Sequence, residues 1–254
     1  MIDVGTGSAV VLLHGFPHTY RLWDRITPRL AQTHRVVAPD LVTGGSALEL
    51  AERLEGLLDD LDIESATMVG IDAGVAAAIG FALQRPDRTQ RLAVMEMVLP
   101  GVAGAEAFTQ NGLPWWFGFH QVPGLAERVL VGHEREYIEW FLRAGTVSGE
   151  GIGSELTDAF AASYQGESAL AGAFEHYRAR SRTAEELAEL LPTRGLKVPV
   201  LAIGSHPVGQ TLAKQLVPFA DDLTSIQLDD CGHLIPLDAP DRLLAALIPW
   251  LDAD

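Results

Sequence analysis

A short apolar run that ends in Gly-x-Asp-x-Gly constrains this chain more than any other feature. Residues 66–71 are strand-like, the sequence GIDAG covers 70–74, and residues 75–84 have the composition of a helix. So tight a turn between strand and helix forces its central residue, Asp72, into strained backbone geometry and lifts its side chain above the sheet. Gly70 and Gly74 are required because a Cβ at either position would clash in the turn.

An aspartate at the centre of this turn has a definite chemistry. The position usually carries serine, whereas the carboxylate of Asp72 can attack carbon without first losing a proton. We therefore expect an alkyl-enzyme ester rather than an acyl-enzyme, formed by opening a strained or activated C–O or C–halogen bond. The alternative is an ordinary turn with a solvated aspartate, so the hypothesis depends on partner groups elsewhere in the chain.

Composition narrows the class of protein. The chain has 254 residues, 48% of them hydrophobic and 20% charged, which is enough for one large α/β domain or a domain with an insertion. The 34 acidic and 18 basic residues give a net charge of −16, which argues against nucleic acid or an anionic membrane as a partner. With Cys231 as the only cysteine and no apolar membrane or signal segment, we expect a soluble, cytoplasmic protein.

Strands and helices alternate along most of the chain. Apolar runs predict buried strands, and apolar side chains at helical spacing predict helices. The expected strands are 8–13, 35–40, 66–71, 91–95, 198–204 and 223–228, and the expected helices are 20–33, 47–60, 75–84 and 240–251. This alternation predicts an α/β fold with a mostly parallel sheet flanked by helices on both faces.

The alternation stops after the fourth expected strand. No strand is predicted at 102–191, and aromatic residues are concentrated there. We therefore expect a core formed by 1–100 and 192–254, and an inserted helical cap, or lid, at 101–191.

Residues with acid, base or nucleophile chemistry follow the expected strands. Asp72, Glu96 and His233 each stand close after a strand, and ligands bind beyond the carboxyl ends of the strands in open parallel sheets. Their order, nucleophile, acid and then histidine, is the triad order of α/β-hydrolases. Residues 205–209, after the next strand, include no carboxylate, which favours Glu96 as the acid. Singly, Glu96 could cap a turn and His233 could be a loop histidine, but the joint pattern favours catalysis.

Over nearly its whole length the sequence resembles the α/β-hydrolase-fold superfamily. The aspartate at the turn is similar to that of epoxide hydrolases, with haloalkane and haloacetate dehalogenases as relatives. The sequence HGFP at 14–17 matches the family's oxyanion loop, and MEMVLP at 95–100 is similar to a branch of epoxide hydrolases with the acid after the sixth strand. The sequence FEHYRA at 174–179 resembles the cap helix that carries the ring-opening tyrosine.

The resemblance implies a role for each core residue of the site. Asp72 would attack an epoxide carbon, His233 would deprotonate the water that hydrolyses the ester, and Glu96 would orient the imidazole. The backbone N–H groups of Phe16 and Ala73 would hold the oxyanion. His14 is expected to shape the oxyanion loop rather than to titrate.

The cap would supply proton donors to the opening oxygen. Tyr177 is the expected acid, because a phenol is far more acidic than an alcohol. His176 could take its place, and we expect helical geometry to let only one of the two face the cavity.

A pair of tryptophans stands where the family normally has a second donor, a tyrosine or a histidine. The sequence PWWFGFH at 114–120 places Trp115 or Trp116 there, next to Phe117. An indole N–H donates a hydrogen bond but does not readily lose its proton. The pair resembles epoxide hydrolases of bacterial aromatic-polyketide biosynthesis, which implies a flat, aromatic or polycyclic substrate. Both residues could instead be packing residues of the cap.

Several expectations concern what binds. Haloacetate dehalogenases hold a carboxylate with arginines just after the nucleophile, whereas Ala73 and Ala76 stand there, so we expect an uncharged epoxide. A haloalkane or haloacid dehalogenase and a catalytically silent binding protein are the alternatives. No residue spacing predicts a metal site or a cofactor, and the sequence leaves a homodimer open.

The remaining titratable groups have no partner pattern. Cys231 is expected to be a small buried hydrophobe. Surface or packing roles are expected for His18, His34, His120, His133 and His206. Compared with the family, the strands before the oxyanion loop and the loop at 41–46 are expected to be shortened.

Overall fold

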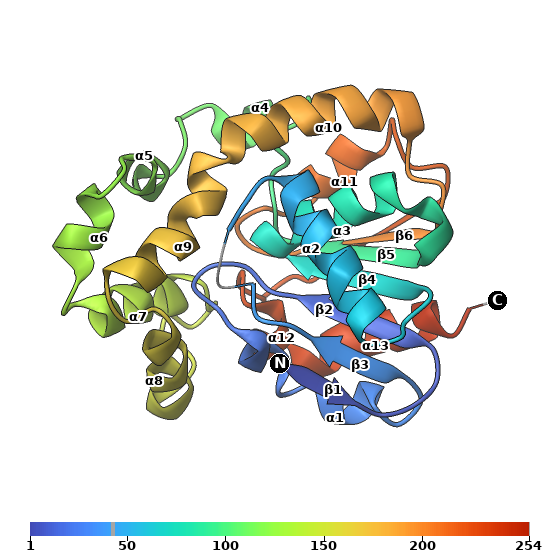
Figure 1. Ribbon diagram of the computed structural model, residues 1–254, viewed down its shortest axis with the longest axis horizontal. Coiled ribbons are helices and arrows are strands. Elements are labelled where there is room, and N and C mark those ends of the chain that lie inside the picture. Colours follow the sequence, from blue (N-terminus) through green and yellow to red (C-terminus); the bar gives the residue numbers. More distant parts are fainter. Residues whose placement is uncertain (42–43, 254) are drawn as a thin grey trace.

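A seven-stranded sheet runs through the centre of the molecule (Figure 1). The computed structural model describes residues 1–41 and 44–253. The strand order is β1-β3-β2-β4-β5-β6-β7; β1 pairs with β3 antiparallel, and all other neighbours are parallel. The strands are β1 (Ile2–Val4), β2 (Ala9–Leu13), β3 (Arg35–Ala38), β4 (Ala66–Ile71), β5 (Thr89–Met95), β6 (Val200–Gly204) and β7 (Leu223–Gln227). The expected α/β-hydrolase fold is confirmed.

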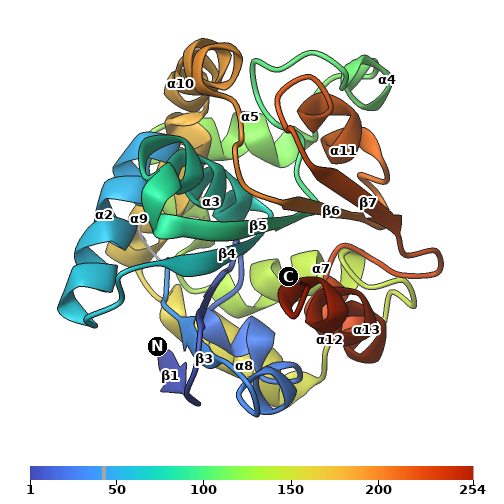
Figure 2. The same ribbon diagram turned by 90° about the vertical axis from the view of Figure 1, so that its right-hand side faces the viewer.

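Hydrophobic cores lie on both faces of the sheet. In β2, Val10 and Leu12 belong to one core, and Val11 and Leu13 belong to the other, because successive side chains of a strand point to opposite faces. Helices cover both faces (Figure 2). The core helices are η1 (Tyr20–Trp23), α1 (Thr27–Leu30), α2 (Ala47–Asp60), α3 (Ala73–Gln84), η2 (Pro86–Arg88), α11 (Thr211–Leu216), α12 (Ile235–Asp238) and α13 (Pro240–Leu251). Burial on both faces explains why the parallel strands are continuous apolar runs.

Most expected core elements are confirmed, with small changes at their ends. Helix α2 begins at 47 because Ser46 and Glu49 form a capping box, in which each side chain accepts a hydrogen bond from the other residue's backbone N–H. The single helix expected at 20–33 is wrong. Two short pieces, η1 and α1, stand in its place, because Pro28 lacks the N–H that a continuous helix would need there.

The sheet edge differs from expectation. A three-residue strand, β1, was not predicted, and it extends the sheet by pairing Ile2 with Ala38 and Val4 with Val36. Strand β2 covers five of the six expected residues. Of the loop at 41–46 that was expected to be short, residues 42 and 43 lie outside the described residues.

Helices alone follow β5 until β6, as expected for a cap. They are α4 (Glu106–Thr109), α5 (Trp115–Gln121), α6 (Leu125–Leu130), α7 (Glu134–Ala144), α8 (Ser154–Ser163), α9 (Glu167–Arg178) and α10 (Arg180–Arg194). Helices α5 to α9 lie at the left of Figure 1, beside the sheet, and α10 crosses above the core. Helix α10 packs on α2 and α3, so it crosses the expected boundary at 191 and returns to the core.

The loop at 14–17, which was expected to be the oxyanion loop, is joined to the cap by aromatic packing. The Phe16 ring has rings of the cap around it, with centroids 5.4–5.6 Å away for Phe141, Tyr164 and Phe174. The Tyr164 hydroxyl also donates a hydrogen bond to the His18 carbonyl oxygen. Edge-to-face ring pairs of this kind stabilise beyond the area that they bury. The cap thus holds the loop that leads to the site.

We expect Gly74→Ala to destabilise the fold. A Cβ on Gly74 would lie 2.2 Å from the Leu13 carbonyl oxygen, a backbone atom of β2 that cannot move without disturbing the sheet. The expected cost is ~1–3 kcal/mol in the free energy of unfolding, measured by urea denaturation. The matched control is Gly56→Ala, since Gly56 lies in α2 with nothing within 4 Å of its added Cβ. This control should stabilise by ~0.5–1 kcal/mol; equal effects of the two substitutions would contradict the packing argument.

Candidate active site

The backbone of Asp72 has the geometry expected for the strand-to-helix turn. Its φ is 52° and its ψ is −131°, a conformation that side-chain-bearing residues rarely adopt. The Asp72 N–H donates to the Met95 carbonyl oxygen at 3.1 Å, so the turn stays tied to β5. The required glycines are confirmed, because a Cβ on Gly70 would lie 2.6 Å from the carbonyl oxygen of Gly74.

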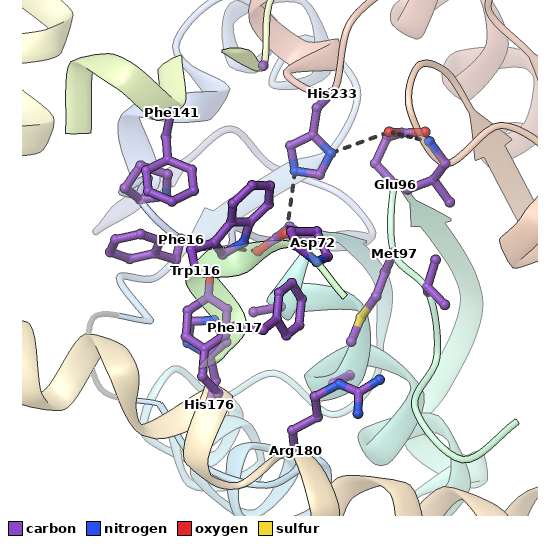
Figure 3. Close-up of a pocket in the computed structure, with 18 of the residues that line it drawn as sticks. Phe16, Asp72, Glu96, Met97, Trp116, Phe117, Phe141, His176, Arg180 and His233 are labelled. Atoms are coloured by element: carbon purple, nitrogen blue, oxygen red, sulfur yellow. Dashed lines mark hydrogen bonds and ion pairs between the residues drawn. The ribbon is translucent and has the colours of Figure 1, made fainter. Parts of the chain in front are cut away.

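The structure brings Asp72, Glu96 and His233 together from three strand ends (Figure 3). His233 Nε2 lies 3.4 Å from Asp72 Oδ2, and His233 Nδ1 lies 3.3 Å from Glu96 Oε2. The buried Glu96 carboxylate accepts hydrogen bonds from the Ser205 N–H at 2.7 Å and the Val208 N–H at 3.5 Å. The loop at 205–209 thus provides no acid of its own, but its backbone holds the acid from β5.

Charge pairing dominates the electrostatics of this triad. Burial alone would lower the pKa of His233, but the hydrogen bonds and charges of Asp72 and Glu96 raise it from 6.5 to about 10. Burial alone would raise the pKa of Asp72, but His233 holds it well below its usual range. At neutral pH the resting site therefore contains an imidazolium between two carboxylates.

Backbone N–H groups of two segments donate hydrogen bonds to the Asp72 carboxylate. The Phe16 N–H donates to Asp72 Oδ1 at 3.2 Å. A hydrogen bond from the Ala73 N–H also contributes to lowering the pKa of Asp72. Both expected oxyanion donors thus contact the carboxylate itself.

His14 holds the loop at 14–17 through hydrogen bonds and does not line the cavity above Asp72. Its Nδ1 lies 2.8 Å from the Gly15 carbonyl oxygen, and its Nε2 accepts the Leu41 N–H at 2.8 Å. Both contacts are satisfied by the neutral tautomer with its proton on Nδ1. This geometry fits the loop-shaping role expected for His14.

A cavity of about 240 Å³ opens above Asp72 between core and cap. Its wall is mostly apolar and aromatic, and Trp116, Phe117 and Phe141 contribute rings to it (Figure 3). Such an apolar pocket with few polar groups is the usual form of a small-molecule site.

Both cap residues at the end of α9 line the cavity, so the expectation that only one of them could face it is wrong. The rings of His176 and Tyr177 lie side by side, with centroids 3.9 Å apart. His176 Nδ1 contacts the Ala173 carbonyl oxygen at 2.7 Å, whereas the Tyr177 hydroxyl has no hydrogen-bond partner within the described chain. Burial, and then the charge of Asp72, raise the pKa of Tyr177 well above 10, so its proton stays in place at neutral pH.

Of the two tryptophans, only Trp116 lines the cavity. Trp115 is 56% exposed and packs edge-on against Trp140 at 5.6 Å, so the structure contradicts a direct contact between Trp115 and a bound substrate. The reason is geometric, because neighbouring side chains on helix α5 point about 100° apart.

Sequence reasoning missed two cavity residues that carry chemistry. His18 was expected at the surface or in packing, but it is fully buried and lines the cavity with its ring 6.5 Å from that of His233. Burial lowers its pKa to about 3, so it is neutral. Arg180 also lines the cavity, whereas the sequence-based expectation concerned only the positions just after Asp72, where Ala73 and Ala76 stand as expected. Its position three residues after Tyr177 was a usable signal.

The other expectations on single residues agree with the structure. Cys231 is buried, as expected. His133 and His206 are exposed, while His34 and His120 are buried in packing. Across residues 1–41 and 44–253 no group of three or more histidine, cysteine, aspartate or glutamate side chains has an arrangement that could hold a metal ion.

Comparisons with known proteins show the family of this chain. The model of the family described as "Alpha/beta hydrolase family" matches residues 10–246, so the chain belongs to that family. It is similar to the haloalkane dehalogenase of Mesorhizobium japonicum, at 23% identity over 97% of this chain and 85% of the relative. It is also similar to the soluble epoxide hydrolase of a Corynebacterium species, at 26% identity over 94% of this chain and 88% of the relative.

A solved structure is also similar to this chain. The crystal structure of Cfl2 from Burkholderia cenocepacia matches with a TM-score of 0.87 and 29% identity, over 98% of this chain and 90% of that one. Together these relatives support a hydrolase. In the described part of the chain, every helix is too short or too polar to cross a membrane.

We expect Asp72→Asn to lower the pKa of His233. The substitution keeps the shape of the side chain and removes the negative charge that stabilises the imidazolium, so the pKa should fall from about 10 by at least about one unit. Titration of the imidazole signals by NMR between neutral and alkaline pH measures this shift. An unchanged titration midpoint would show that Asp72 does not control the charge of His233.

Proposed function

We propose that the protein hydrolyses an epoxide to a vicinal diol through an ester on Asp72. The observation that supports this most is the arrangement of the carboxylate, with Oδ1 against the Phe16 N–H, Oδ2 against His233 and a mostly apolar cavity above. An aspartate held in this way is a nucleophile that needs no base to activate it.

The first step alkylates Asp72. A carboxylate oxygen attacks one epoxide carbon, the C–O bond of the ring breaks, and the electron pair moves to the ring oxygen. Tyr177 gives that oxygen a proton, and the indole N–H of Trp116 stabilises the developing negative charge. The open hydroxyl of Tyr177 in the cavity supports this assignment.

Alkylation then converts His233 into a base. Once Asp72 is an ester it has no charge, so the imidazolium of His233 loses its main anionic partner. Its proton passes to the Tyr177 phenolate that the first step left, which restores the phenol. Neutral His233, oriented by Glu96, takes a proton from water as the water oxygen attacks Cγ of Asp72. The Phe16 and Ala73 N–H groups hold the oxyanion, and its collapse expels the diol oxygen as an alkoxide, which takes the proton from His233. The acid proton left on Asp72 then passes to His233, which restores the carboxylate and the imidazolium.

The rings of the cavity support a flat, aromatic substrate. Phe16, Trp116, Phe117 and Phe141 all line it, and broad rings contact a planar substrate over large areas. The proposal includes no cofactor, because both steps need only water and the side chains named above. It also places the enzyme in the cytoplasm.

A haloalkane dehalogenase is the second candidate function. Trp116 in the cavity is the observation that favours it, since an indole N–H can bind a leaving halide. The similarity to a haloalkane dehalogenase adds support. The presence of Tyr177 favours an oxygen leaving group, because the oxygen of an opening epoxide needs a proton and a leaving halide does not. Parallel assays of halide release and diol formation distinguish the two reactions, and inactivity in both would favour a binding protein.

Replacing the base should trap the intermediate. In His233→Gln, an aryl epoxide should alkylate Asp72, and the ester should accumulate because no group deprotonates water. Intact-protein mass spectrometry should find the mass of the substrate added once, and peptide mapping should locate it on Asp72. Absence of a covalent ester would sink the mechanism.

The unsubstituted enzyme offers an independent check with isotopes. During a single turnover in heavy-oxygen water, label should enter the Asp72 carboxylate, while the new oxygen of the diol comes unlabelled from Asp72. Label that appears directly in the diol would mean attack by water on the epoxide.

We expect Tyr177→Phe to slow alkylation more than ester hydrolysis. The substitution keeps the ring but removes the proton donor to the opening oxygen, and loss of such a donor costs about 10²- to 10⁴-fold in that step. Rapid-quench measurement of ester formation and decay separates the two rates. The matched control is Tyr137→Phe, because Tyr137 bonds to His120 within the cap and lies outside the cavity wall. An alkylation rate equal to that of the control would contradict the role of Tyr177.

A further inference from the structure

We propose that Arg180 binds an anionic oxygen group on the substrate, a carboxylate in its simplest form, so that the natural substrate is an aryl epoxide that also carries an acid. The claim that the substrate is an epoxide rests on the proposed function. The claim that it carries an acid replaces the sequence-based expectation of an uncharged substrate. The acid claim rests on Arg180 alone.

Arg180 is the first residue of α10 and lines the cavity (Figure 3). Its guanidinium carbon lies 5.8 Å from the centre of the Phe117 ring, another cavity residue. In Figure 3 the guanidinium lies on the side of Phe117 away from Asp72. Among the described residues no carboxylate lies within 4 Å of it, and no hydrogen bond of its side chain is found.

The neighbouring arginines differ from Arg180, because both form ion pairs and only Arg180 of the three faces the cavity. Arg178, two residues earlier, pairs with Glu127 and Glu175. Arg182, two residues later, pairs with Glu49 and Glu186. Thus the two arginines that flank Arg180 each contact two carboxylates, while the one that faces the cavity contacts a ring.

The acidic composition of the chain makes it significant that Arg180, a cation in the cavity wall, has no carboxylate partner among the described residues. The sequence has 34 acidic residues against 18 basic ones, so carboxylates are abundant, yet none of the described ones is placed beside Arg180. A partly buried cation without a counter-ion has lost hydration that nothing replaces. Burial accordingly lowers the pKa of Arg180, whereas ion pairs raise the pKa of Arg178. An anion on the substrate would supply the missing partner, and a planar guanidinium matches a carboxylate with two parallel hydrogen bonds.

The position of Arg180 also decides where the acid would lie on the substrate. Ala73 and Ala76 line the cavity next to Asp72, so no arginine stands there to hold an acid. The imidazolium of His233 is already paired with Asp72 and Glu96. A carboxylate close to Asp72 would be repelled by its charge. An acid held at Arg180, beyond Phe117, leaves the neutral epoxide end free to reach Asp72. The inferred substrate therefore has its epoxide and its acid at separate ends of an aromatic frame.

The kinetic test compares matched substrates. Aryl epoxides with one or two fused rings are prepared with a carboxylate and with the corresponding carboxamide. For the better of the two frames, the unsubstituted enzyme should show a kcat/KM about tenfold or more higher for the carboxylate, most of it in KM. In Arg180→Met that ratio should fall to about one, and in Arg180→Lys it should be partly restored, because the charge returns without the planar fork.

Arg182→Met is the matched control. It removes the same charge from the same helix, but Arg182 is exposed, ion-paired and outside the cavity wall. The carboxylate preference should survive in this variant. Equal kcat/KM for carboxylate and carboxamide in the unsubstituted enzyme, or loss of the preference in Arg182→Met as well, would overturn the proposal.

A binding experiment separates this proposal from the proposed function. Naphthoate and naphthamide contain no epoxide, and calorimetry measures their affinity without catalysis. Naphthoate should bind the unsubstituted protein about tenfold or more tightly than naphthamide, and Arg180→Met should abolish the difference. If this holds while no epoxide is hydrolysed, the reaction is wrong and the acid site stands. If epoxides are hydrolysed but naphthoate has no advantage, the reaction stands and the acid site is wrong.

Discussion

The close approach of backbone around Asp72 is the constraint on which the rest of the site depends. The turn between β4 and α3 is tied to β5 by the Asp72 N–H, and it passes so near β2 that Gly74 has no room for a side chain. A positive φ at Asp72 is tolerated because its neighbours are fixed, Ile71 in strand β4 and Ala73 in helix α3. This strain directs the carboxylate out of the sheet and towards the cap.

Around that carboxylate the fold assembles charges from distant parts of the chain. Glu96 and His233 are 137 residues apart, yet both stand at the carboxyl edge of a parallel sheet. The alternation of negative, positive and negative groups keeps His233 charged until Asp72 reacts. In the proposed mechanism, neutralising Asp72 is therefore the event that changes His233 from a cation into a base, so one charge pair controls the order of the two steps.

The cap decides which molecules can reach the nucleophile. Phe16 connects the oxyanion loop to cap rings, and the end of α9 brings His176 and Tyr177 over Asp72 together. Where the chain passes from α9 into α10, Arg180 adds a cation to a wall that is otherwise mostly apolar. Acid recognition and proton donation would then come from residues three apart in sequence, so changes in this short segment would alter specificity and rate together.

The sequence by itself determined the parallel strands β2 to β7, the turn at Asp72 and the candidate triad, but not the edge strand β1. Apolar runs, glycine spacing and strand ends are local signals, and a parallel sheet brings its strand ends to one edge. It did not reveal which tryptophan faces the cavity, that His176 and Tyr177 both do, or that His18 and Arg180 reach the site. Those outcomes depend on how each cap helix is rotated and on which partner each side chain meets. Only the tertiary structure decided them, since packing between segments far apart in sequence sets a helix's rotation and leaves an arginine without a carboxylate.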